Sequence, residues 1–141
     1  MDDVGERLRA GAAGALAGEP VVVAYLFGSQ ARGAARAGSD VDVAVLLRAD
    51  VPADRYLDLQ LDVARRLAAA TGLGDLDVVV LNDAPLPLRG RVVLDRQVIW
   101  SSDEPARVEY ESRTVREFVD YQVHARELDR ALMARHADGT R

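Results

Sequence analysis

Five residues in three short stretches have the types and the spacing that phosphate and metal chemistry require. Gly28 and Ser29 end an apolar run, Asp40 and Asp42 follow after ten intervening residues, and Asp77 opens a further apolar run. A strand that ends in Gly-Ser and turns into a helix leaves backbone N–H groups and the helix dipole pointing at an anion. Gly28 permits close approach of a phosphate, and the Ser29 hydroxyl can donate a hydrogen bond to it.

The three carboxylates predict a cation site beside this phosphate site. Asp40 and Asp42 are two residues apart on a predicted strand, so their side chains project from one face, about 6–7 Å apart. Carboxylates this close repel one another unless a cation bridges them, and Mg²⁺ prefers carboxylate and phosphate oxygens. If the strand that Asp77 opens lies beside the first, three carboxylates can hold two Mg²⁺ ions about 3.5–4 Å apart. That arrangement suits in-line attack on a nucleotide phosphorus, with all three aspartates as metal-binding and catalytic residues.

Alternatives exist for three residues near this constellation. Arg32, on the first turn after the Gly-Ser pair, either contacts the triphosphate or the acceptor, or is a solvated or structural residue. Asp75 competes with Asp77 for the third carboxylate position, and Asp77 is favoured because it leads the apolar run. Asp83 is predicted to cap a helix that starts near Pro85 rather than to bind a metal.

Four strands are expected to position these residues. β-branched and apolar runs predict strands at residues 20–27, 40–47 and 76–81, and a short edge strand at 97–100. The first run is apolar throughout, which is typical of a strand covered on both faces. The second run alternates, so one face carries the aspartates and the other carries valine and leucine.

Helices are predicted before, between and after these strands, at residues 3–16, 52–70 and about 104–137. The helix at 52–70 is expected to bury a stripe made of Leu57, Leu61, Ala64 and Leu67. The last helix carries one apolar face made of Phe118, Tyr121, Ala125, Leu128 and Leu132. It is long for a small fold, so either part of this face extends outward to meet a partner or all of it packs on the sheet.

The pattern as a whole predicts an α/β (or α+β) fold with a small mixed sheet of about four strands flanked by helices.

The composition excludes several classes of protein. The 141 residues include no Cys and no Lys, and all 18 basic residues are Arg. These absences rule out disulfide scaffolds, thiol nucleophiles, a Walker A loop and Schiff-base chemistry. The net charge of -5 gives no support for direct nucleic-acid binding. With no signal-peptide pattern and no apolar run long enough for a membrane, we expect a cytoplasmic protein of one domain, residues 1–141.

The motifs resemble those of a known superfamily. LFGSQARG at residues 26–33 and SDVDVAV at 39–45 are similar to the motifs of polymerase β-type nucleotidyltransferases, and most similar to those of the minimal, or MNT, members. The segment DVVVLNDAP at 77–85 also resembles theirs. The resemblance covers residues 20–100 closely and the last helix more loosely.

The resemblance implies the nucleotidyltransferase fold, ATP as the nucleotide substrate and two Mg²⁺ ions. It assigns Gly28 and Ser29 to the triphosphate, with Arg32 beside them, and Asp40, Asp42 and Asp77 to the metal. It further implies an antitoxin that pairs with a HEPN-family toxin and silences it by AMPylation, transferring AMP from ATP to a toxin tyrosine. Such a chain is a protein adenylyltransferase, and any oligomer would form through the complex.

Three other functions compete with this interpretation. One is an antitoxin that acts by binding alone, against which the intact set of motif residues counts. Another is a nucleotidyltransferase for a small molecule such as an aminoglycoside. Only one helix follows the predicted core, whereas such enzymes normally add a helical domain to complete the acceptor pocket. A third, nucleotide addition to RNA, lacks a basic or aromatic platform.

Overall fold

The computed structural model describes residues 3–28 and 41–139, with side chains up to Arg135. Its strands form one mixed sheet in the order β3-β2-β1-β4. The strands are β1 (Val21–Phe27), β2 (Val41–Leu47), β3 (Leu76–Val80) and β4 (Gln97–Ser101). β2 runs antiparallel to β1 and parallel to β3, and β4 pairs with the other side of β1. The predicted small mixed sheet is confirmed, including its edge strand near residues 97–100.

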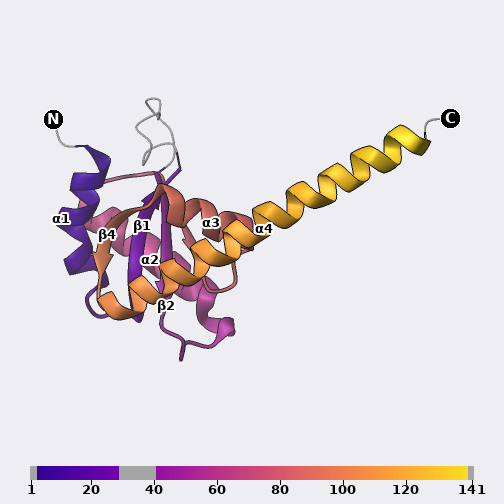
Figure 1. The fold of residues 1–141 in the computed structure, drawn as a ribbon. Coiled ribbons are helices and arrows are strands. Elements are labelled where there is room, and N and C mark those ends of the chain that lie inside the picture. Colours follow the sequence, from indigo (N-terminus) through magenta and orange to yellow (C-terminus); the bar gives the residue numbers. More distant parts are fainter. Residues whose placement is uncertain (1–2, 29–40, 140–141) are drawn as a thin grey trace.

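Helices cover both faces of the sheet (Figure 1). They are α1 (Val4–Leu16), α2 (Tyr56–Thr71), preceded by a 3₁₀ turn at Ala53–Arg55, α3 (Leu86–Asp95) and α4 (Glu104–Gly139). Asp3 caps α1 by accepting a hydrogen bond from the Glu6 N–H at 2.7 Å. The predicted cap at Asp83 is wrong, because α3 starts after Pro85 and has no side-chain capping bond. Within the described residues, no helix has both the length and the apolar character that a membrane span needs.

Two apolar cores lie on opposite faces of the sheet. One packs α1 and α2 against the side chains of Val41, Val43, Val45 and Leu47. The other packs α3 and the start of α4 against Ala44, Leu46 and their neighbours on β1. All seven residues of β1 are buried, as expected for a strand covered on both faces. The alternation of β2 therefore places its aspartate-bearing face on the side that α3 and α4 cover.

The face that α2 buries agrees only in part with the expected one. Leu67 is buried and Ala64 packs against the same core, as predicted. Leu57 and Leu61 are instead 63% and 57% exposed, and Leu59 and Val63 are buried in their place. Both sets of residues recur at helical spacing, so the periodicity alone does not choose between them. Packing against α1 and the sheet selects the buried set, and this packing is not local in the sequence.

A buried carboxylate, that of Glu111, joins α4 to the centre of the sheet. The hydroxyl of Tyr25 on β1 donates to Oε2 of Glu111 at 2.8 Å, and Nη1 of Arg107 donates to the same oxygen at 2.9 Å. Nε of Arg96, which follows α3, lies 3.2 Å from the other carboxylate oxygen. Because a buried carboxylate is costly unless it is paired and hydrogen-bonded, these contacts fix where α4 crosses β1.

The Tyr25 contact predicts a loss of stability at alkaline pH. Burial, and then the hydrogen bond and charge of Glu111, raise the pKa of Tyr25 well above its usual value near 10. A group whose pKa is higher in the folded than in the unfolded state stabilises the fold fully when the pH is below its unfolded-state pKa. That stabilisation is lost as the pH rises toward the folded-state pKa. With neither Lys nor Cys in the chain, tyrosines dominate titration above pH 9. We expect the free energy of unfolding to fall above about pH 10, in urea denaturation measured from pH 8 to 11.5.

The Tyr25→Phe variant isolates the contribution of this residue. At neutral pH it should lose about 1.5–3 kcal/mol, because it removes a hydrogen bond to a charged group. Its alkaline decline should be shallower than that of the wild type, with a remainder from Tyr110, whose pKa is also raised by burial. A decline identical to the wild type would contradict the role of Tyr25.

Candidate functional site

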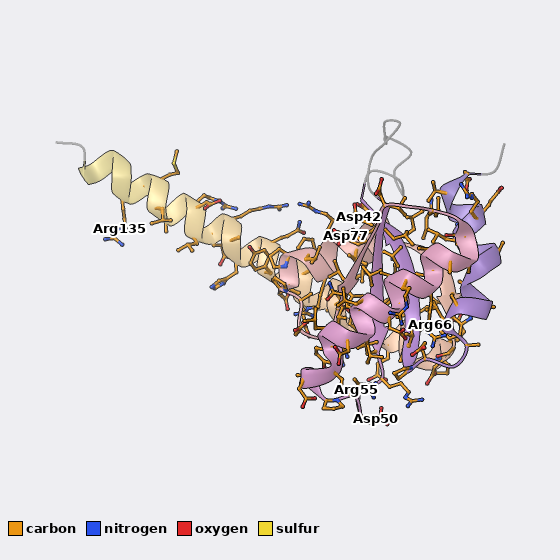
Figure 2. The ribbon with its side chains drawn as sticks, turned by 180° about the vertical axis from the view of Figure 1, so that it is seen from behind. Asp42, Asp50, Arg55, Arg66, Asp77 and Arg135 are labelled. Carbon is orange, nitrogen blue, oxygen red and sulfur yellow. The ribbon has the colours of Figure 1, made fainter. Side chains whose placement is uncertain are left out.

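The edge of the sheet where β2 and β3 begin brings two of the predicted carboxylates together. Asp42 and Asp77 are directly paired positions of these parallel strands. Neighbouring strands lie about 4.8 Å apart, which is close enough for two carboxylates on one face to share a cation. Both side chains are on the face of Ala44 and Val79, the face covered by α3 and α4. Figure 2 shows the two residues side by side at the start of their strands.

The apolar pattern of the two strands fixes this register. In β2, Val41 and Val43 flank Asp42 and are buried against α1 and α2. In β3, Val78 follows Asp77 and is buried in the same core. A slip of one residue would move these side chains to the other face of the sheet, so burial of the valines holds the aspartates opposite one another.

Asp75 lies just before β3 and does not take part in this pairing. Its carbonyl oxygen accepts a hydrogen bond from the Val41 N–H at 2.9 Å, which joins the starts of the two strands. The side chain of Asp75 is exposed. The residue opposite Asp42 is therefore Asp77, which is also exposed, while Asp42 is partly buried. A ligand from solvent can reach the pair from the Asp77 side.

Gly28 lies against the carboxylate of Asp42. It follows Phe27, the residue of β1 that pairs with Asp42, and its φ of 76° is in the left-handed region. A Cβ atom at this position would lie 2.6 Å from Oδ2 of Asp42, which is closer than real contacts allow. The sequence suggested that Gly28 gives access to a phosphate. The structure adds that a glycine here leaves room for the aspartate.

Three of the predicted residues, Ser29, Arg32 and Asp40, lie outside the described residues. Among the residues that are described, no group of three or more His, Cys, Asp or Glu side chains could hold a metal ion. Of the three predicted ligands, the structure describes Asp42 and Asp77. The third, Asp40, directly precedes Val41 of β2 in the sequence. Paired carboxylate oxygens at a solvent-accessible edge fit a hard divalent cation such as Mg²⁺.

The sequence profile of the family "Polymerase beta, Nucleotidyltransferase" matches residues 15–105. The match spans all four strands and includes Gly28, Asp42 and Asp77. The chain therefore belongs to the polymerase β nucleotidyltransferase family.

Solved structures with a similar fold include several toxin–antitoxin complexes. A toxin–antitoxin structure with AMP-PNP has a TM-score of 0.66 and 23% identity over 89% of this chain and 98% of the matched chain. The structure of the tri-AMPylated Shewanella oneidensis HEPN toxin in complex with MNT antitoxin has a TM-score of 0.63 and 20% identity, and the match covers 92% of this chain and 99% of the matched chain. A toxin–antitoxin MntA-HepT structure has a TM-score of 0.62 and 21% identity, and the match covers 89% of this chain and 97% of the matched chain. At these identities the likeness shows a shared fold. No curated protein matches this chain by sequence.

The close approach at Gly28 predicts that Gly28→Ala weakens nucleotide binding. The added methyl group displaces the Asp42 carboxylate, and we expect a loss of roughly tenfold or more in affinity for a non-hydrolysable ATP analogue with Mg²⁺. Isothermal titration calorimetry measures this loss. Gly72→Ala is the matched control, because Gly72 has nearly the same φ of 75° and contacts neither Asp42 nor Asp77.

Both variants should lose stability on the order of 1–3 kcal/mol from backbone strain. If Gly72→Ala weakens binding as much as Gly28→Ala does, general strain rather than the Asp42 contact explains the loss.

Proposed function

We propose that this chain is the antitoxin of a HEPN-type toxin and that it transfers AMP from ATP to a tyrosine hydroxyl of that toxin. In this proposal residues 1–141 form one Mg²⁺-dependent nucleotidyltransferase domain that acts in the cytoplasm, where ATP is available. The observation that carries the proposal is the pairing of Asp42 with Asp77 in a nucleotidyltransferase fold, with Gly28 against Asp42.

Similar structures support the nucleotide and the partner in this proposal. One toxin–antitoxin structure contains AMP-PNP, and in another the HEPN toxin is tri-AMPylated and bound to an MNT antitoxin. The matched chains are covered almost completely, at 98% and 99% of their lengths. The likeness thus extends across nearly the whole of each matched chain.

The chain's own residues would divide the work at the sheet edge. Gly28 and Ser29 bind the triphosphate, helped by Arg32, and the three aspartates hold the metal. Bound Mg²⁺ supplies positive charge beside the triphosphate and lowers the pKa of the attacking hydroxyl. The acceptor oxygen bonds to the α-phosphorus, the bond from that phosphorus to the bridging oxygen breaks, and pyrophosphate leaves. Asp77, the more exposed of the described pair, accepts the proton of the hydroxyl.

Substitution of Asp77 tests this assignment against a closely matched control. Asp77→Asn should lower transfer of label from α-labelled ATP to the toxin by more than roughly a hundredfold, because it removes both a ligand and the proton acceptor. Asp75→Asn makes the same change of charge two residues earlier, at an exposed position outside the pairing. It should retain nearly full transfer. Circular dichroism checks that both variants fold.

The same assay separates the competing functions. Full transfer by Asp77→Asn, or loss of transfer in Asp75→Asn alone, would contradict the assigned site. A wild-type chain that inhibits the toxin without labelling it would show an antitoxin acting by binding alone. Label found on an aminoglycoside and not on the toxin would show a small-molecule enzyme.

Removal of divalent cations gives a second test. EDTA should abolish transfer while leaving the circular dichroism spectrum unchanged, since the two cores hold the fold without a metal. Addition of Mg²⁺ in excess of the chelator should restore transfer. Transfer that persists after exhaustive chelation would contradict a metal role for the aspartates.

A further inference from the structure

The outer edge of β3 carries backbone groups that the sheet does not use. β3 is the last strand of the sheet, and among the described residues it pairs only with β2. The pairing is fixed at both ends of β3. The Asp75 carbonyl accepts a hydrogen bond from the Val41 N–H at 2.9 Å, and the Leu81 N–H donates to the Val45 carbonyl at 2.8 Å.

These two bonds determine which residues of β3 face outward. Along a strand, the N–H and C=O groups of successive residues point to opposite sides. Asp77 and Val79 are in phase with the two bonded ends, so their backbone groups point to β2. The N–H and C=O groups of the alternate residues therefore point away from the sheet. These residues are Leu76, Val78 and Val80.

Solvent reaches this edge beside the candidate site. Asp77 is exposed at the start of β3 (Figure 2), and Leu76 and Val79 are half-buried. α2 packs over the opposite face of the strand, where Val78 and Val80 are buried. The edge is thus accessible at the residue that an acceptor hydroxyl has to approach.

The chain around this edge is acidic. From residue 67 to residue 88 it contains three aspartates, Asp75, Asp77 and Asp83, and no basic residue. All three aspartate side chains are exposed. When Asp77 holds a cation, the other two carboxylates still favour a positively charged partner.

We propose that an extended, basic segment of the toxin adds to β3 as an antiparallel strand, with the acceptor tyrosine opposite Asp77. This inference rests on the proposed function, which requires a protein hydroxyl at Asp77. The outward groups of β3 bond to the backbone of the segment, a mode in which sheet edges bind extended peptides. A basic residue two positions after the tyrosine comes opposite Asp75.

Antiparallel geometry brings the tyrosine close to Asp77. Because the backbone groups of Asp77 point to β2, the residue opposite it forms a non-hydrogen-bonded pair, with Cα atoms about 4.5 Å apart. The two side chains leave the sheet on one face, with Cβ atoms about 4.5–5.5 Å apart. That face also carries Asp42, so the hydroxyl approaches the carboxylate pair from its exposed side.

The length and charge of β3 favour a substrate segment over a second copy of this chain. Its five residues span about 17 Å at about 3.3 Å per residue. A strand pair of that length buries on the order of a few hundred Å², well below the roughly 1,200 Å² of stable interfaces. Two copies would also set their acidic edges against each other. A small contact of opposite charge suits a segment that must leave after transfer.

Hydrogen–deuterium exchange, measured by mass spectrometry without nucleotide, tests the added strand. In the free chain the amides of Asp77 and Val79 are protected by β2, whereas those of Leu76, Val78 and Val80 should exchange faster. An excess of the toxin should protect these three amides as well. The measurement follows a peptic peptide that covers β3.

A proline at the start of β3 tests the backbone contact. Leu76→Pro removes one outward N–H, and proline is tolerated at the first residue of a strand and on an edge, so the fold should remain. The KM for the toxin should rise roughly two- to tenfold, as for the loss of one hydrogen bond, with the KM for ATP unchanged. Leu76→Ala is the matched control, because it removes the same side chain and keeps the N–H.

Charge reversal tests the basic character of the segment. Asp75→Arg should raise the KM for the toxin roughly two- to tenfold, and less at high salt concentration. Its kcat should not change, so transfer at saturating toxin stays full, as expected for Asp75→Asn. Asp58→Arg makes the same charge change at an exposed position of α2 and should leave the KM as in the wild type. An equal KM in Asp75→Arg and Asp58→Arg would contradict a basic segment at this edge.

The outcomes distinguish this inference from the proposed function. If the wild type labels the toxin but β3 gains no protection, or if Leu76→Pro and Leu76→Ala have the same KM for the toxin, the added strand is wrong and the proposed function stands. Protection of β3 that appears in the chain alone as its concentration rises would assign the edge to a second copy. If the toxin accepts no label, the proposed function fails and this inference fails with it.

Discussion

The parallel pairing of β2 with β3 is the constraint on which the candidate site depends. It places Asp42 directly opposite Asp77, and burial of the valines beside them prevents a slip in register. Neither strand could form the site alone, because α2 must first return the chain so that β3 runs parallel to β2.

The covering helices connect the site to the rest of the chain. Tyr25 of β1 is held by Glu111 of α4, and β1 leads within three residues to Gly28, which lies against Asp42. The same α4 continues past the sheet, where Leu128 and Leu132 are exposed. One helix thus anchors the strand that precedes the site and also extends beyond the fold.

Much of this fold could be predicted from the sequence, because β-branched runs and alternating aspartates mark strands with defined faces. That β3 lies beside β2 could be stated only as a condition for Asp77 to reach the site, since pairing between distant strands is not local. The face of α2 was predicted correctly at Ala64 and Leu67 but wrongly at its start, because Leu57 and Leu59 both begin helical stripes and only packing selects between them. The contact of Gly28 with Asp42 needed the backbone angle and the side-chain position, which no motif contains.

We propose that Asp42 and Asp77 together bind the cation that accompanies the nucleotide. A crystal structure with an ATP analogue and Mn²⁺ in place of Mg²⁺ tests it most directly, since the anomalous signal locates the ion. We expect an anomalous peak within about 2.0–2.4 Å of a carboxylate oxygen of each residue, with the triphosphate beside Gly28. A nucleotide bound with its cation held elsewhere, for example by Asp75, would contradict the account.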